Sequence, residues 1–242
     1  LVSLPDYDLN QRVSISDNIY TNKITLGVYE LGSVFKTFTI AAGLENKVIN
    51  PNTIFKNLEN SLTCDKYTIS EHDKLPKNLS VEQILVRSSN IGSVKIAQKV
   101  GIKNYKEFLN SLKLFQKINF DLDEIGVPLS FRWGKCKLAT ASFGRGITTT
   151  PLQLARAYAI LGNGGFEIQP FILKNETKLI KKGKQIVSVE TSDAINSMLR
   201  KVVSLDEGTA NFADVKGYEV GGKTGSSVKY DKNAKLNTFV SL

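Results

Sequence analysis

The central part of the chain has the hydrophobic periodicity of helices. Between residues 33 and 45, apolar side chains fall on most faces of a helix, which predicts a central helix rather than a surface one. Residues 80–88, "SVEQILVRS", predict another helix with Ser80 as N-cap and Gln83 completing a capping box. Further helices are expected at residues 90–101 with Gly101 at the end, 103–114, 150–165 with Pro151 in the first turn, and 192–204 with Ser192 as the cap.

Patterns typical of strands lie toward the two ends of the chain. Residues 218–230 and 236–242 predict two strands joined by a polar loop, and "LVSLP" at residues 1–5 predicts the tail of another strand. We therefore expect an α+β fold, with an antiparallel sheet built from both chain ends, helices packed on it and a helical subdomain. Residues 1–242 would then form one domain that is incomplete at both termini.

The composition is that of a globular protein. Of the 242 residues, 41% are hydrophobic, which is enough to bury a sizeable core. No stretch reaches the roughly 18 consecutive apolar residues that a membrane-spanning helix needs. The formal net charge is +9, but the lysines are scattered, and their densest cluster, at residues 179–184, has no interleaved aromatic residues to stack on bases. We interpret the charge as solvated surface and expect no nucleic-acid partner.

Histidine and cysteine are scarce, which argues against several kinds of site. His72 is the single histidine, and Cys64 and Cys136 lie far apart, so the usual ligand set for zinc is missing. We expect no metal and no cofactor. The same scarcity argues against a serine–histidine triad, so a nucleophilic serine here needs a different base. Whether Cys64 and Cys136 pair is left open by the sequence.

One serine and one lysine lie a single helical turn apart in "YELGSVFKTFTIAAG", residues 29–43. Ser33 and Lys36 would share one face of a helix. A structural role is the alternative, in which Ser33 caps the helix and Lys36 reaches out of it to solvent. A second pattern, Lys223-Thr224-Gly225, follows two glycines in a predicted strand, where glycine indicates the close approach of another backbone or a ligand.

The motifs S-x-x-K and K-T-G belong, with S-D-N, to the signature set of penicillin-binding proteins and class A β-lactamases. Ser16-Asp17-Asn18 spells S-D-N but precedes Ser33, whereas the family places this element after the nucleophile and between two helices. Ser88-Ser89-Asn90 lies in that place, so we assign Ser88 and Asn90 to the motif and treat the earlier match as a coincidence. Ser226 and Lys229 spell another S-x-x-K, but on a strand they would not share a face, so we discount that match too.

In this order, the motifs resemble the class B penicillin-binding proteins, most closely the FtsI-like cell-division type. The resemblance covers nearly the whole chain and rests on "LVSLPDYDLN", "GSVFK", "RSSNIGSVKIAQKVG", "SFGRGITTTPLQLARAYAILGNGG" and "GYEVGGKTGSS". It implies a β-lactamase/transpeptidase-like fold. The sequence departs from the family at Leu31, where proline is common, at Arg145, where glutamine is common, and at Ser226, where threonine usually follows K-T-G. Of these, Arg145 is the departure that we expect to alter peptide recognition.

The resemblance also implies roles for the motif residues. Ser33 would attack the carbonyl of the penultimate D-alanine in a peptidoglycan stem peptide and form an acyl-enzyme. Lys36 would take the hydroxyl proton, and burial together with a second cation at Lys223 would favour the neutral amine that this needs. Ser88 would relay a proton to the departing D-alanine amine. Asn90 would hold the peptide amide of the substrate, and capping of the following helix is its alternative role.

The K-T-G strand would hold the other end of the substrate. By the same resemblance, Thr224 would bind the terminal carboxylate, and Lys223 would supply positive potential. Gly225 would leave room for the substrate backbone beside the strand. The backbone N–H groups of Ser33 and Ser226 would form the oxyanion hole.

The implied function is a D-alanyl-D-alanine transpeptidase that cross-links stem peptides in cell-wall synthesis at division and is covalently inhibited by β-lactams. Divisome membrane proteins would be its partners. It would lie on the extracytoplasmic (periplasmic) face of the bacterial inner membrane, anchored by an N-terminal segment absent from this chain. Two alternatives stay open: a hydrolase, either a D,D-carboxypeptidase or a β-lactamase, and a penicillin-sensing domain. Glu124 is the one carboxylate considered as a base for hydrolytic water, and a solvated loop charge is its expected role.

Overall fold

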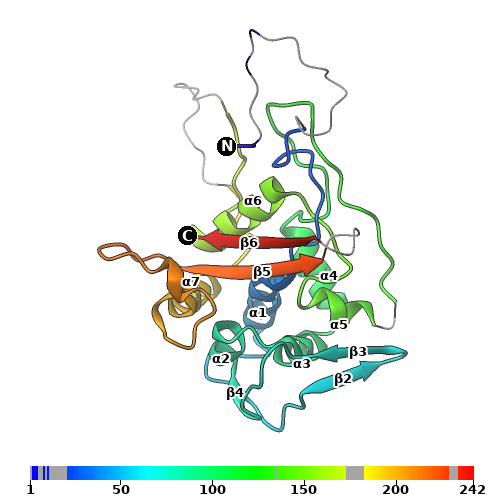
Figure 1. Ribbon diagram of the computed structural model, residues 1–242, viewed down its shortest axis with the longest axis vertical. Helices are drawn as coiled ribbons and strands as arrows, with labels where there is room; N and C mark the ends of the chain where they lie inside the picture. The colour runs from blue at the N-terminus through cyan, green and yellow to red at the C-terminus, as the bar shows by residue number, and fades with distance from the viewer. Residues whose placement is uncertain are drawn as a thin grey trace.

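A computed structural model of the chain describes residues 2–4, 8, 10, 21–134, 136–172, 183–228 and 234–242. It has the expected α+β class, with helices packed around a two-stranded antiparallel sheet (Figure 1). The helices are α1 (Lys36–Glu45), α2 (Val81–Val86), α3 (Asn90–Val100), α4 (Ile102–Ser111), α5 (Lys137–Ala141), α6 (Pro151–Gly162) and α7 (Val189–Ser204), with 3-10 turns η2 (Gly32–Phe35) and η3 (Asn211–Ala213). The strands are β1 (Ile54–Phe55), β2 (Ser61–Cys64), β3 (Tyr67–Ser70), β4 (Leu79–Ser80), β5 (Gly222–Val228) and β6 (Lys235–Ser241).

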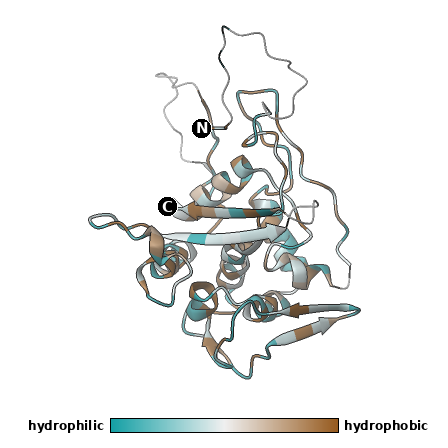
Figure 2. Cartoon of the chain, viewed as in Figure 1, coloured by the Kyte–Doolittle hydropathy of each residue, from teal (hydrophilic) through white to brown (hydrophobic). Residues whose placement is uncertain are grey.

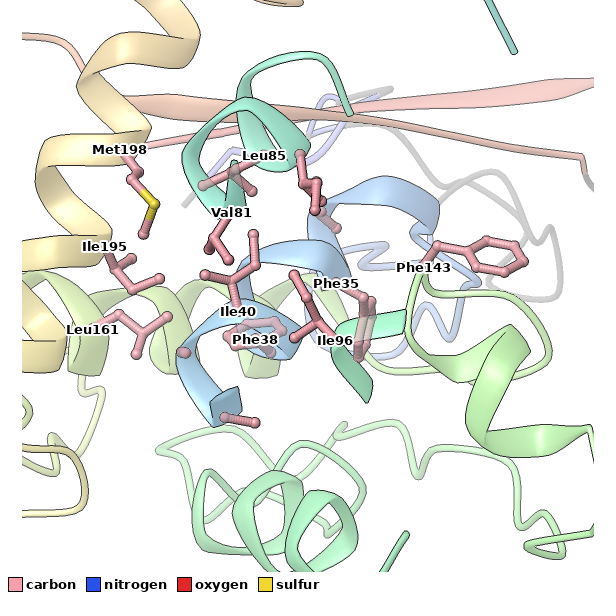
Figure 3. Close-up of a cluster of buried hydrophobic side chains, with 14 of the residues drawn as sticks. Phe35, Phe38, Ile40, Val81, Leu85, Ile96, Phe143, Leu161, Ile195 and Met198 are labelled. Atoms are coloured by element: carbon pink, nitrogen blue, oxygen red, sulfur yellow. The ribbon is translucent and has the colours of Figure 1, made fainter. Parts of the chain in front are cut away.

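Helix α1 runs through the hydrophobic core. Every residue from Lys36 to Gly43 is buried, and the helix contacts α3, α4 and α7. Figure 3 shows Phe38 and Ile40 surrounded by side chains from α2, α3, α6 and α7, namely Val81, Leu85, Ile96, Leu161, Ile195 and Met198. This burial confirms the prediction of a central helix, and it fixes the turn that precedes the helix against the rest of the fold.

Three of the predicted helix boundaries are observed, among them the end of α3 at Gly101, and one is wrong. Ser80 and Gln83 form the expected capping box at α2, and α6 starts at Pro151. Helix α7, by contrast, starts one turn earlier than predicted, because its N-cap is Ser188 and not Ser192. Ser192 is buried inside the helix and donates its hydroxyl to the carbonyl of Leu161.

The correct cap of α7 is selected by a distant residue. The carboxylate of Glu45, at the end of α1, accepts hydrogen bonds from the backbone N–H of Ser188 at 3.0 Å and from its hydroxyl at 2.8 Å. The Ser188 hydroxyl in turn accepts from the N–H of Thr191 at 3.2 Å. Because a carboxylate at a helix N-terminus also interacts favourably with the helix dipole, this contact favours Ser188 over Ser192.

The two predicted C-terminal strands pair as antiparallel β5 and β6, with Thr224 opposite Phe239 and Ser226 opposite Asn237. Burial alternates along β6, as expected for a strand with one covered face. Strand β5 consists mainly of glycine, serine and threonine and is pale in Figure 2. Its small residues let it lie close to η2, which it contacts along one edge.

The strand expected at residues 1–5 is not formed by the described residues of that segment. Val2, Ser3 and Leu4 belong to no strand. Val2 and Leu4 are 79% and 65% exposed, so they have no apolar surface to pack on. The segment is instead held by Lys23, whose N–H donates to the Ser3 hydroxyl at 3.2 Å and whose Nζ donates to the Leu4 carbonyl at 2.7 Å.

Several features were not predicted, among them the short β1–β4 pair, the β2–β3 hairpin, the short helix α5, and a disulfide that joins the hairpin to α5. Cys64 at the end of β2 pairs with Cys136, the residue before α5, with 5.8 Å between their Cα atoms. The sequence left open whether these two cysteines pair, and the structure shows that they do. Among the residues described, we find no helix with the length and apolarity that crossing a membrane requires.

Candidate active site

Ser33 lies in η2, directly before α1, and lines the main pocket. The turn is held in place by Tyr158 of α6, whose buried hydroxyl bonds the carbonyl of Val34 at 2.7 Å and the hydroxyl of Thr37 at 2.8 Å. Burial raises the pKa of Tyr158, so this hydroxyl remains neutral. Neither η2 nor α1 has a side-chain cap, so the alternative role of Ser33 as a cap is not observed.

Lys36 and Lys223 converge on Ser88. The Ser88 hydroxyl lies 3.1 Å from the Nζ of Lys36 and 2.9 Å from the Nζ of Lys223, and Lys36 also donates to the Ser88 carbonyl. Both lysines have no exposed surface. The alternative in which Lys36 reaches solvent is therefore wrong, and the three sequence motifs meet at one hydroxyl group.

Burial lowers the pKa of both lysines. Desolvation lowers the pKa of Lys223 to about 7. For Lys36, desolvation comes first and the positive charge of Lys223 second, and together they hold its pKa well below the ordinary value. The negative charge of Glu71 raises the pKa of Lys36, against these two effects. Since a neutral amine can accept a proton, Lys36 has the electrostatic surroundings of a general base.

Ser88 and Asn90 occupy a tight turn between α2 and α3. Ser88 adopts a left-handed backbone with φ of 57°, which is rare for a residue other than glycine. Ser89 is the N-cap of α3, so the alternative role of Asn90 as that cap is wrong. The side-chain amide of Asn90 donates to the carbonyl of Ser70 at 2.8 Å, while its Oδ1 is buried without a donor among the described residues.

Strand β5 forms the opposite wall. Thr224, Gly225 and Ser226 all line the pocket. The Thr224 hydroxyl donates to Thr209 at 3.1 Å, and the Ser226 hydroxyl donates to Asn237 on β6 at 3.0 Å. A Cβ at position 225 would lie 2.3 Å from the carbonyl oxygen of Leu31, so glycine is needed for β5 to approach η2.

The pocket has a volume of about 680 Å³. Six of the eight residues predicted for the site line it, and the two buried lysines lie next to Ser88 behind its wall. Those six are Ser33, Ser88, Asn90, Thr224, Gly225 and Ser226. The exposed side chain of Arg145 is also part of the lining, as expected for a residue that affects peptide recognition.

Sequence reasoning missed several charged residues of the pocket lining, namely Glu30, Glu71, Asp73, Arg87 and Lys235. Of these, Glu71, which follows β3, contacts the turn that carries the motif residues. Burial alternates in β2 but not in β3, so Asp65 in the connecting turn was the main sequence signal for this hairpin. Glu124, considered as a base for hydrolytic water, is exposed and does not line the pocket. It has the solvated position that the sequence favours.

The discounted S-D-N match and the lysine of the discounted S-x-x-K match lie in parts of the chain that the structure does not describe. Ser16, Asp17, Asn18 and Lys229 all lie outside the described residues. Within the described part of the chain, no group of histidine, cysteine, aspartate or glutamate residues could hold a metal ion.

Comparison with known proteins agrees with this geometry. A model of the family described as "Penicillin binding protein transpeptidase domain" matches residues 1–241. The chain is 34% identical over 234 residues to the "Probable peptidoglycan D,D-transpeptidase FtsI" of Caulobacter vibrioides, covering 96% of this chain and 39% of that protein. It is 33% identical to the "Peptidoglycan D,D-transpeptidase FtsI" of Buchnera aphidicola, covering 100% of this chain and 43% of that protein. The chain thus spans about two fifths of the length of these relatives.

A solved structure shows the same fold. The apo transpeptidase domain of penicillin-binding protein 3 from Burkholderia pseudomallei superimposes with a TM-score of 0.84 at 28% identity, covering 91% of this chain and 69% of that one. The crystal structure named as a peptidoglycan glycosyltransferase from Burkholderia ambifaria gives a TM-score of 0.81 at 27% identity, covering 93% and 75%. With the family match over almost the whole sequence, these likenesses show that the chain belongs to the penicillin-binding protein transpeptidase domain family.

Proposed function

We propose that this chain carries a serine-type D-alanyl-D-alanine transpeptidase site that cross-links peptidoglycan stem peptides and is acylated by β-lactams. The observation that carries this proposal is the position of Ser88, whose hydroxyl lies within hydrogen-bonding distance of two buried lysines beside the pocket that Ser33 lines. The names of the FtsI relatives support the same reaction and a role in cell division. Divisome partners and an extracytoplasmic membrane-anchored location are part of the proposal.

In this proposal Ser33 is the nucleophile and Lys36 the base. Lys36 is one turn from Ser33 and buried, and desolvation together with the charge of Lys223 lowers its pKa, which favours the neutral amine. It takes the hydroxyl proton as the Ser33 oxygen bonds to the carbonyl carbon of the penultimate D-alanine. The oxyanion that forms accepts hydrogen bonds from the backbone N–H groups of Ser33 and Ser226, and one such donor is typically worth about 2.7–4 kcal/mol.

Ser88 then connects the two lysines to the leaving group. Its hydroxyl contacts both amines, so a proton held by Lys36 can pass through Ser88 to the nitrogen of the departing D-alanine as the carbon–nitrogen bond breaks. The acyl group remains on Ser33. The amine of a second stem peptide attacks this ester, and its proton returns by the same route, which regenerates the Ser33 hydroxyl.

The substrate is held from two sides. The unpaired Oδ1 of Asn90 is an acceptor for the peptide N–H of the stem, which supports the role proposed for this side chain. Thr224 lies on the opposite wall with its hydroxyl near Thr209, in a position to bind the terminal carboxylate. Lys223 adds positive potential when it is charged. The expectation that Gly225 leaves room for the substrate backbone is wrong, because the space that a Cβ would take there is filled by the carbonyl oxygen of Leu31 at 2.3 Å and by Val34.

Two of the carboxylates that line the pocket are engaged in hydrogen bonds, which favours transfer to an amine over hydrolysis. Glu71 has both oxygens engaged in hydrogen bonds with the start of α3. One oxygen of Glu30 accepts from the N–H of Gly146 at 2.9 Å. Glu124 is not in the pocket lining. Asp73 is a third carboxylate of the lining and it is exposed, so the lifetime of the acyl-enzyme is the test that separates transfer from hydrolysis.

The test has two parts, carried out on separate samples: covalent labelling by a fluorescent penicillin, and transfer by unlabelled protein with lipid-linked precursor and a labelled acceptor amine. Wild-type protein should take one label, and Ser33→Ala should take none. Ser16→Ala, in the discounted S-D-N match, is the control and should label as wild type does. Labelling that persists in Ser33→Ala would place the nucleophile elsewhere, and failure to join the acceptor amine would contradict the transferase.

A further inference from the structure

Glu71 joins the β2–β3 hairpin to the start of α3. Its Oε1 accepts a hydrogen bond from the Ser89 hydroxyl at 2.5 Å and from the backbone N–H of Ile91 at 3.0 Å. Its Oε2 accepts from the backbone N–H of Asn90 at 2.7 Å. One carboxylate thus satisfies two of the backbone donors that every helix leaves free at its N-terminus, and its charge suits that end of the helix dipole.

The neighbouring residue of the hairpin strengthens this connection. The carbonyl of Ser70 accepts from the side-chain amide of Asn90 at 2.8 Å. That bond fixes which end of the Asn90 amide faces the hairpin, so the Oδ1 atom is left without a donor among the described residues. Ser70 and Glu71 therefore hold both the backbone and the side chain of Asn90.

Ser88 is the residue that needs this support. Its φ of 57° is seldom adopted by residues with a side chain, and such a conformation persists only where the surroundings enforce it. The turn is enforced from the α2 side by hydrogen bonds from the N–H groups of Ser88 and Ser89 to the carbonyls of Leu85 and Ile84, at 3.1 and 2.9 Å. From the α3 side it is enforced by Glu71, through Ser89 and Asn90.

Charge gives Glu71 a second connection to the site. The charges of Lys223 on β5 and of Glu71 beside the hairpin both act on Lys36. The positive charge of Lys223 lowers the pKa of Lys36, and the negative charge of Glu71 raises it. Without the negative charge of Glu71, only the positive charge of Lys223 would act on the pKa of Lys36, and that pKa would fall. A residue that held only the hairpin in place would not have this effect.

We propose that Glu71 is a positioning residue of the transfer reaction: its carboxylate fixes the Ser88–Asn90 turn so that the Ser88 hydroxyl stays between Lys36 and Lys223. The inference rests on the function proposed above for this site. It does not make Glu71 a catalytic residue, because its oxygens contact the turn and not the reacting atoms.

Glu71→Gln tests this with little change in size. Glutamine keeps one acceptor oxygen, but it loses the charge and turns an NH2 group toward donors that need an acceptor. Glu82→Gln is the matched control, because Glu82 is a carboxylate at a helix N-terminus, in the first turn of α2, that pairs with Lys201 at 2.7 Å, away from the pocket lining. The measurements are the acylation rate constant with fluorescent penicillin from pH 5 to 10 and thermal unfolding by circular dichroism.

We expect Glu71→Gln to acylate about 10–100-fold more slowly, as for a small misplacement of a catalytic group. The acid limb of its pH profile should move to lower pH, because Lys36 loses the charge that raises its pKa. Glu82→Gln should stay within about twofold of wild type, as surface changes generally do. If Glu71→Gln does not fold, Glu71→Asp serves instead, and it should be slowed less, with the acid limb unmoved, because it keeps the charge.

Two results would overturn the inference. One is acylation of the folded Glu71 variant at the wild-type rate. The other is a rate loss in Glu71→Gln that accompanies a fall in melting temperature with an unmoved acid limb, which would make Glu71 purely structural. Wild-type labelling at Ser33 separates the two claims. If wild type labels normally and Glu71→Gln does too, only this inference fails, whereas a wild-type chain that takes no label contradicts the proposed function and this inference with it.

Discussion

The Nζ of Lys223 donates a hydrogen bond to the hydroxyl of Ser88 over 2.9 Å, although 135 residues separate the two in sequence. Lys36 reaches the same hydroxyl from the opposite side at 3.1 Å. One serine side chain therefore connects a helix, a turn and a strand. The proposed proton transfers depend on this arrangement, and the predictions below test its parts.

Replacing Lys36 by methionine should remove the base while keeping most of the buried volume. Acylation by a fluorescent penicillin should fall by about 10²–10⁴-fold, the usual contribution of general-base catalysis. Circular dichroism should show an unchanged fold. A folded Lys36→Met protein that labels at the wild-type rate would show that Lys36 has a structural role only.

Lys223 should make stability depend on pH. Its pKa is about 7 in the folded chain and near the ordinary 10.5 when unfolded, so between these values the unfolded state binds more protons. Stability contributed by this residue therefore rises with pH across this window. Relative to Lys223→Met, wild type should gain up to about 1.4 kcal/mol per pH unit between about pH 7 and 10.5 in denaturant titrations. A difference in unfolding free energy that does not change with pH would show that Lys223 is not buried as a neutral amine.

Gly144→Ala should disturb the site without touching a catalytic side chain. Gly144 has φ of +81°, and a Cβ there would lie 2.1 Å from the carbonyl oxygen of Gly32, the residue before Ser33. We expect a stability loss of about 1–3 kcal/mol and slower acylation. Gly134→Ala is the control, because nothing lies within 4 Å of its added Cβ. Equal unfolding free energies for the two variants would contradict the close packing of η2 against Gly144.

How much of this site the sequence predicts depends on whether its parts are local. Ser33 and Lys36 are one helical turn apart, so their shared face follows from helix geometry, and the capping box at Ser80 is likewise local. The family resemblance then brings Ser88 and Lys223 to the same place. The capping box and the meeting of Lys36, Ser88 and Lys223 are observed, whereas Ser33 lies in the 3-10 turn before α1 and its role as nucleophile stays a prediction.

The parts that were missed or wrong depend on contacts between distant segments. Ser188 and Ser192 are both reasonable caps for α7, and only the carboxylate of Glu45, 143 residues before Ser188, selects the first. Strands β2 and β3 have four residues each, too few for alternation to stand out, so the hairpin that carries Glu71 was not recognised.

The disulfide should stabilise this hairpin. Cys64 and Cys136 close a loop with a sequence separation of 72, and a cross-link of that span is expected to contribute about 2–4 kcal/mol. The double variant Cys64→Ser, Cys136→Ser should lose that amount in urea unfolding, and wild type should lose it on addition of a reductant. Unfolding free energies that do not respond to reductant would show that the bond does not stabilise the fold.

The central claim, acyl transfer from Ser33 to an amine, is tested most directly by the lifetime of the acyl-enzyme. Benzylpenicillin is added to the protein, and mass spectrometry follows the peptide that carries Ser33. The account predicts one stoichiometric mass increase on that peptide, still present after many minutes, because both oxygens of Glu71, the carboxylate beside the Ser88–Asn90 turn, are engaged by the start of α3 and are not free to activate water. An adduct that disappears within seconds while penicilloic acid accumulates catalytically would contradict the transpeptidase and identify a β-lactamase.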